Sequence, residues 1–85
     1  MTPIKKHFEF SRHALEQMKL RNISKAVVDD ILASPGQILN EDVLQVYQST
    51  TADRKFLIRI FVNESNRVIT VYKTSKIKKY YEGKI

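Results

Sequence analysis

The hydrophobic and polar positions follow a helical period in the first part of the chain. Apolar residues repeat at helical spacing behind Ser11 and again behind Ser24, and a serine at such a position can cap the first turn of a helix. The first repeat ends near residues 20–22, and Pro35 followed by Gly36 ends the second. The pattern therefore predicts two short helices at the N-terminal end of the domain.

The period changes to two after Gly36, which indicates strands. Residues 43–50, 55–62 and 67–74 are rich in β-forming residues, and residues 37–39 are candidates for a short edge strand. The turn residues between these runs, 51–53 and 63–66, are few enough to favour antiparallel hairpins. The middle run carries apolar residues on both faces, as a central strand does when helices cover one face. We expect an α+β fold in which two N-terminal helices pack on a three- or four-stranded antiparallel sheet.

Length and composition limit the kinds of site that the chain can build. We expect a single domain over residues 1–85, and a domain this small buries only about 60% of the surface of its unfolded chain. An open groove for a polymer or a protein partner is therefore expected rather than an enclosed site. The sequence has no cysteine, no apolar run of membrane-spanning length and no signal-peptide core. We expect a soluble cytoplasmic protein without disulfides.

The net charge of +6 is unevenly distributed. Residues 1–25 carry six basic and two acidic side chains, and residues 65–85 carry six basic and one acidic. Residues 26–64 carry three basic and six acidic side chains. If the fold brings the two ends together, one face attracts phosphate groups; the alternative is a lysine-rich surface that only keeps the protein in solution.

The candidate RNA-binding residues are Arg59, a cation on an expected strand, and the basic C-terminal segment. Arg59 lies on the strand expected to be central, where it either contacts a phosphate group, forms an ion pair or is solvated. Lysines beside tyrosines can hold a nucleic-acid backbone while a ring stacks on a base. The alternative is a C-terminal turn whose lysines are simply solvated. The candidate set is Arg59, Lys73, Lys76, Lys78, Lys79, Tyr80 and Tyr81.

The sequence lacks the motifs of metal and cofactor chemistry. It has two histidines without a metal-binding spacing, and only two glycines, so we expect neither a metal site nor a cofactor. Metal-free RNA cleavage needs a base, an acid and cations around the phosphate. His13 and Arg21 are the candidate catalytic residues, on one face of the first helix and about 12 Å apart along its axis. The alternative for His13 is a surface residue that is hydrogen-bonded to Gln17 or Glu16.

The first expected helix and its cap resemble a small prokaryotic family of domains of unknown function. The stretch reads His13-Ala14-x-x-Gln17-Met18-x-x-Arg21-x-Ile23-Ser24, and the family signature is H-A-x-x-R-M-x-x-R-x-I-S. Pro35 and the strand Val68-Ile69-Thr70-Val71-Tyr72 extend the resemblance, which covers the chain from about Phe8 to Tyr80. This family is similar to RelE-like and BrnT-like toxins. The resemblance implies helices on a small antiparallel sheet, metal-independent cleavage of messenger RNA and neutralisation by an antitoxin chain.

Two classes of function follow for the chain. Gln17 stands where the signature has arginine, and the loss of this cation weakens any phosphate-binding role of the helix and favours a binding-only or degenerate member of the family. The first class is therefore a toxin-type metal-independent endoribonuclease or an RNA-binding relative, with RNA and an antitoxin-like protein as partners. The second is a non-catalytic protein-interaction module that docks through Leu57 and Phe61 on the open sheet face.

Overall fold

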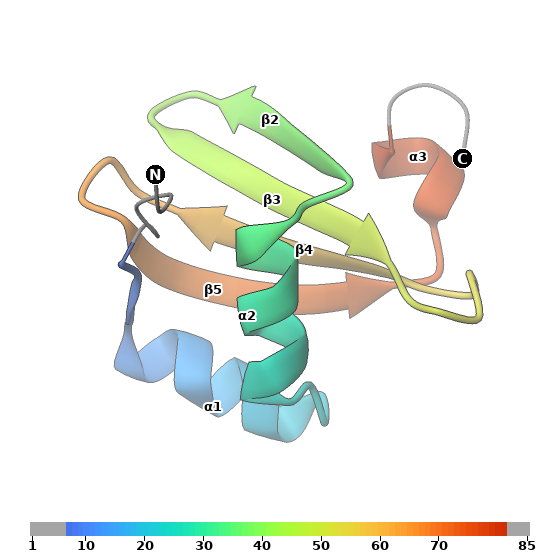
Figure 1. The fold of residues 1–85 in the computed structure, drawn as a ribbon, viewed down its shortest axis with the longest axis horizontal. Helices are drawn as coiled ribbons and strands as arrows, with labels where there is room; N and C mark the ends of the chain where they lie inside the picture. Colours follow the sequence, from blue (N-terminus) through green and yellow to red (C-terminus); the bar gives the residue numbers. More distant parts are fainter. Residues whose placement is uncertain (1–6, 82–85) are drawn as a thin grey trace, which may run out of the picture.

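Two helices cover one face of a five-stranded sheet in the computed structural model, which describes residues 7–81 (Figure 1). The helices of this part of the chain are α1 (Arg12–Leu20), α2 (Lys25–Ala33) and the short α3 (Ile77–Tyr80). The strands are β1 (Glu9–Phe10), β2 (Gln37–Glu41), β3 (Leu44–Thr50), β4 (Leu57–Val62) and β5 (Arg67–Thr74). The predicted α+β class is confirmed.

The two predicted helices begin at the predicted serines. The hydroxyl oxygen of Ser11 accepts from the backbone N–H of Ala14 (3.0 Å), and that of Ser24 accepts from Val27 (3.2 Å). The serine caps satisfy amides that the first turn of a helix leaves without partners. Between the helices, Asn22 has a positive φ of 54°, and the N–H of Ile23 donates to the carbonyl of Met18 (2.8 Å). This tight turn lets α2 follow α1 after only four residues.

The sheet is mixed, which corrects the prediction of a purely antiparallel sheet. The strand order is β1-β5-β4-β3-β2, and β2 to β5 form the predicted antiparallel arrangement, including the edge strand. The fifth strand is β1, which pairs in parallel with β5, so that Glu9 lies opposite Arg67 and Phe10 opposite Val68. Two residues are too few to show an alternating pattern in the sequence, and for this reason β1 was not predicted.

The hydrophobic core lies between the helices and the sheet face that they cover, which we call the inner face. Ala14 and Val28 contribute from α1 and α2, and Ile60 and Val71 from the two central strands, all fully buried. Of the helices within residues 7–81, the short α3 is the one that lies against the opposite, outer face. No helix within residues 7–81 is long and apolar enough to cross a membrane.

Candidate nucleic-acid interface

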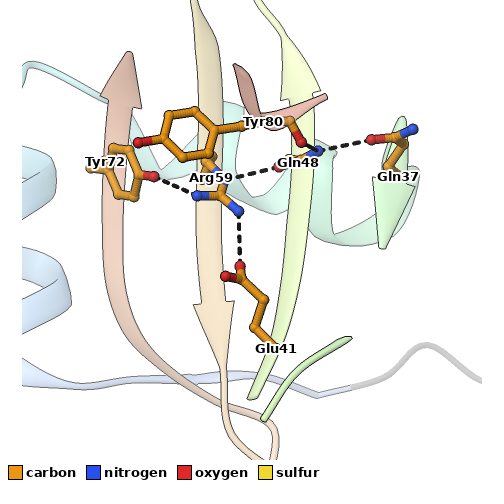
Figure 2. Close-up of polar contacts among 6 residues, drawn as sticks. All are labelled: Gln37, Glu41, Gln48, Arg59, Tyr72 and Tyr80. Carbon is orange, nitrogen blue, oxygen red and sulfur yellow. Dashed lines mark hydrogen bonds and ion pairs between the residues drawn. The ribbon is translucent and has the colours of Figure 1, made fainter. Parts of the chain in front are cut away.

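Arg59 lies at the centre of a polar cluster on the outer face (Figure 2). Its guanidinium donates from Nε to Oε1 of Gln48 (2.9 Å), from Nη1 to the hydroxyl of Tyr72 (2.5 Å) and from Nη2 to Oε2 of Glu41 (2.9 Å). Gln48 and Tyr72 are the residues directly opposite Arg59 on the neighbouring strands β3 and β5. The cluster, hereafter the Arg59 cluster, consists of Gln37, Glu41, Gln48, Arg59, Tyr72 and Tyr80.

The Arg59 cluster holds the C-terminal segment against the sheet. The side-chain amide of Gln48 donates to the backbone carbonyl of Tyr80 (3.1 Å) and to Oε1 of Gln37 (2.8 Å). The Tyr80 ring lies over the guanidinium of Arg59, with 4.4 Å between the ring centroid and Cζ. The hydroxyl oxygen of Tyr81 lies close to Gly36, the residue just before β2. A Cβ atom built on Gly36 would be 3.1 Å from that oxygen, so Tyr81 packs closely against the start of β2. The outer face therefore positions both Tyr80 and Tyr81.

The burial of Arg59 is balanced by its partners. Its side chain is 5% exposed, whereas that of Glu41 is 48% exposed. Taking a guanidinium out of water is costly unless charged and polar groups replace the lost hydration. Within residues 7–81 no buried side-chain nitrogen or oxygen lacks a hydrogen-bond partner. The ion pair with Glu41 is one of the alternatives that the sequence allowed, and direct contact of Arg59 with a phosphate group is blocked in this arrangement.

A basic and aromatic surface surrounds the Arg59 cluster. Lys76, Lys78 and Lys79 are exposed on and beside α3, and Tyr80 and Tyr81 are half-buried. The half-buried rings of Phe61 and Tyr72 stack with 5.8 Å between centroids and 22° between planes. We call this surface the α3 surface and define it by Lys76, Lys78, Lys79, Phe61, Tyr72, Tyr80 and Tyr81. Exposed lysines beside partly exposed rings are the side chains that single-stranded nucleic acids contact.

Lys73 does not join the other candidate lysines. It lies opposite Ile58 on the inner side of the sheet, since neighbouring residues of a strand point to opposite faces. Its Nζ lies 5.0 Å from the centroid of the Phe56 ring. The sheet thus separates Lys73 from the α3 surface.

The candidate catalytic residues lie on α1 and in its C-terminal cap, also on the inner side. His13 and Arg21 are both exposed, and Nε of Arg21 donates to Oε1 of Gln17, one turn earlier on α1 (3.2 Å). No hydrogen bond of His13 occurs within the described residues, so neither Gln17 nor Glu16 holds its ring. The structure does not bring His13 and Arg21 together with Arg59, because α1 and the Arg59 cluster lie on opposite faces of the sheet. Among residues 7–81, no group of three or more His, Asp or Glu side chains is placed to hold a metal ion.

The docking surface predicted for a protein partner is incomplete. Leu57 is fully buried although it points to the outer face, and Phe61 is half-buried beside Arg59. The large apolar residues that are exposed lie elsewhere, and the most exposed are Leu20 (78%) and Val43 (68%). An interface through Leu57 would require removal of the residues that cover it.

The fold and the cluster define an α+β domain with a buried arginine network on its outer face. Residues 10–78 match the family model described as "Domain of unknown function (DUF4258)", and the chain belongs to this family. The description names no activity, substrate or partner. No curated protein and no solved structure matches the chain.

Most partners of Arg59 were not recognised in the sequence. Glu41, Gln48 and Tyr72 lie 11 to 18 residues from Arg59 along the chain. One signal was present, because a cation on a central strand needs a counter-charge and Glu41 ends the edge strand β2, two strands away. The strand register that selects Gln48 and Tyr72 was not evident from the sequence pattern.

Proposed function

We propose that this domain binds single-stranded RNA through the α3 surface. The observation that carries the proposal is the position of Lys79, whose Nζ lies 5.3 Å from the centroid of the Tyr80 ring, while the buried Arg59 holds that ring from the sheet. Lys78 is exposed beside it. The exposed lysines can contact phosphates, and the partly exposed rings offer edges or faces on which a base can stack. In this proposal Arg59 acts indirectly, because it positions Tyr80 and does not contact the RNA.

A toxin-type, metal-independent endoribonuclease is the more specific form of the same proposal. It rests on the resemblance to RelE-like and BrnT-like toxins and on the exposed imidazole of His13, since histidine is a common general acid or base. RNA that contacts both His13 and the α3 surface must pass around an edge of the sheet. For this reason the geometry supports RNA binding better than cleavage. An antitoxin-like chain is the protein partner that the toxin form requires.

The test measures binding and cleavage of labelled single-stranded RNA by the full chain in EDTA. We expect binding that weakens steeply as salt rises, since each phosphate contact releases counterions. The variant Lys78→Gln/Lys79→Gln should bind at least about tenfold more weakly. The matched control Lys19→Gln/Lys25→Gln removes the same charge from exposed sites on α1 and α2, on the other side of the sheet, and should bind like the wild type apart from a small general effect of net charge.

Each part of the proposal has its own opposing result. Equal loss of affinity in the two double variants would show that only net charge matters and would contradict an α3 site. Products with cyclic phosphate ends that disappear in His13→Ala would support the ribonuclease form. Absence of salt-sensitive RNA binding would favour the protein-interaction module instead, with exposed residues such as Leu20 at its interface.

A further inference from the structure

A pocket opens on the inner side of the sheet, where the turn between α1 and α2 meets the loop after β3. Its volume is about 330 Å³, at the lower end of the range for small-molecule sites. The buried side chains of Ile23, Ile31 and Ile58 line it, and Val27, 41% exposed, lies at its margin. The pocket therefore offers an aliphatic wall that is open to water on one side.

Lys73 is the only charged residue among those described that line this pocket. None of the ion pairs within residues 7–81 involves Lys73. Asp53 is the nearby acidic residue, but its carboxylate accepts from the hydroxyl of Thr51 (2.5 Å) and from the backbone N–H of Lys55 (3.0 Å). The ammonium group of Lys73 lies 5.0 Å from the centroid of the Phe56 ring and forms no ion pair within residues 7–81, so it can still pair with an anion in the pocket.

The hydroxyl group of Ser24 adds to the polar side of the lining. Its oxygen accepts from the N–H of Val27, which leaves the hydroxyl proton free to donate. Thr50 also lines the pocket, but it lies opposite Leu57, so its side chain points to the outer face. One cation and one hydroxyl donor beside an aliphatic wall match a ligand with a single negative charge and a hydrocarbon body. A phosphate dianion would fit less well, because its second charge would have no counter-charge and Asp53 lies near.

We propose that this pocket binds a small aliphatic carboxylate, with the carboxylate beside Lys73 and the hydrocarbon chain against Ile23, Ile31 and Ile58. The site lies on the other side of the sheet from the Arg59 cluster. It does not depend on RNA binding.

Octanoate is the probe for this proposal. In a titration of the full chain followed by methyl NMR, the signals of Ile23, Ile31 and Ile58 should shift together and saturate. Lys73→Met should weaken binding about tenfold or more, since a hydrogen bond to a charged group is lost. Lys79→Met removes the same charge on the outer face and should leave the affinity unchanged. Asp53→Asn should tighten binding, because it removes a negative charge close to the carboxylate.

Two comparisons separate a specific site from general adsorption. Octanol has the same hydrocarbon chain without charge, and it should bind the wild type about as weakly as octanoate binds Lys73→Met. Lys73→Arg keeps the cation and should retain binding, which guards against misfolding of the methionine variant. The proposal is overturned if the isoleucine signals do not saturate, if Lys73→Met and Lys79→Met bind octanoate equally, or if octanol binds as tightly as octanoate.

Discussion

Gln48 and Arg59 lie directly opposite one another on β3 and β4, and both are buried on the outer face of the sheet. The side-chain oxygen of Gln48 accepts from Nε of Arg59 at 2.9 Å, and its amide nitrogen donates to the carbonyl of Tyr80 at 3.1 Å. One glutamine therefore connects the central strand to the C-terminal helix. The position of the exposed α3 lysines depends on this buried pair.

Replacement of Arg59 by methionine should destabilise the domain by about 2–4 kcal/mol, because Gln48, Tyr72 and Glu41 each lose a hydrogen bond. The half-exposed Glu41 can be rehydrated, which keeps the cost below that of a fully buried pair. Arg67→Met is the matched control, since Arg67 and Glu9 form an exposed ion pair at 3.6 Å that is worth less than about 1 kcal/mol. Urea denaturation measures the free energy of unfolding of the two variants. If Arg59→Met lost no more stability than Arg67→Met, the Arg59 cluster would not be stabilising.

Ser11→Ala should cost more stability than Ser24→Ala, although both serines cap helices. The loss of a serine cap costs about 1 kcal/mol. Ser11 also donates from its hydroxyl to the carbonyl of Ile69 (3.1 Å), which connects α1 to β5, so its removal should cost about 2 kcal/mol. Thermal or urea unfolding distinguishes the two variants. An equal cost would mean that the bond to Ile69 adds nothing.

The elements of the fold were largely predictable because their signals are local. Serine caps, the proline and glycine after α2 and the alternation of strand residues each act over a few positions. The short strand β1 was missed because its pairing with β5 joins Glu9 to Arg67, far apart in the sequence. The short helix α3 was missed because it contacts the outer face through Gln48 and Arg59 rather than through a pattern of its own.

The candidate site was less predictable, because strand register decides which side chains meet. The sequence predicted a turn over residues 51–53, but the loop between β3 and β4 spans residues 51–56. Within it, Thr51 donates its N–H to the carbonyl of Phe56 (2.8 Å), and Arg54 has a φ of 60°. A different loop length changes the residue opposite Gln48, so the pairing with Arg59 could not be read from the pattern. Lys73 was grouped with the other candidate lysines, but neighbouring residues of β5 point to opposite faces, and the register places Lys73 opposite Ile58 on the inner side.

Asp53 should titrate below the ordinary range of an aspartate. The hydroxyl of Thr51 and then the backbone N–H of Lys55 lower the pKa of Asp53, with a smaller effect from the charge of Lys73. Thr51→Val should raise this pKa toward the ordinary value of an aspartate, and the neighbouring substitution Thr50→Val should leave it low. NMR titration of the Asp53 carboxyl carbon measures both.

The same shift gives a pH dependence of stability with a definite sign. Because the pKa of Asp53 is lower in the folded state, its stabilising effect is present above about pH 4 and is lost as the pH falls through the folded-state value. The carboxylate is fully exposed, so the effect on unfolding is small. If acid destabilised the wild type and Thr51→Val by the same amount, the lowered pKa of Asp53 would not contribute to the pH dependence of stability.

Arg54→Gly should stabilise the domain by about 0.5 kcal/mol. Arg54 has a φ of 60°, in the left-handed region where a side chain is strained and glycine is not. The gain in the folded state is partly offset by the greater freedom of glycine in the unfolded chain. Lys55→Gly, one residue further at an ordinary φ, should instead destabilise by about 0.5–1 kcal/mol. Chemical denaturation of Arg54→Gly and Lys55→Gly measures these changes in stability. If both variants lost the same amount of stability, Arg54 would not be strained.

Tyr80 should act through its ring and not through its hydroxyl. The ring centroid lies 4.4 Å from Cζ of Arg59 and 6.4 Å from the centroid of the Tyr72 ring, and the Tyr80 hydroxyl makes no hydrogen bond within residues 7–81. Tyr80→Phe should therefore leave both stability and RNA affinity close to the wild type. Tyr80→Ala should cost about 2 kcal/mol of stability, because a desolvated cation–π contact and ring burial are lost. It should also weaken RNA binding, since α3 would lose its contact with Arg59.

Urea unfolding and RNA titration of Tyr80→Phe and Tyr80→Ala measure the effects on stability and on RNA affinity. A phenylalanine variant as impaired as the alanine variant would mean that the hydroxyl contacts the RNA directly, and that the role assigned to the ring is wrong.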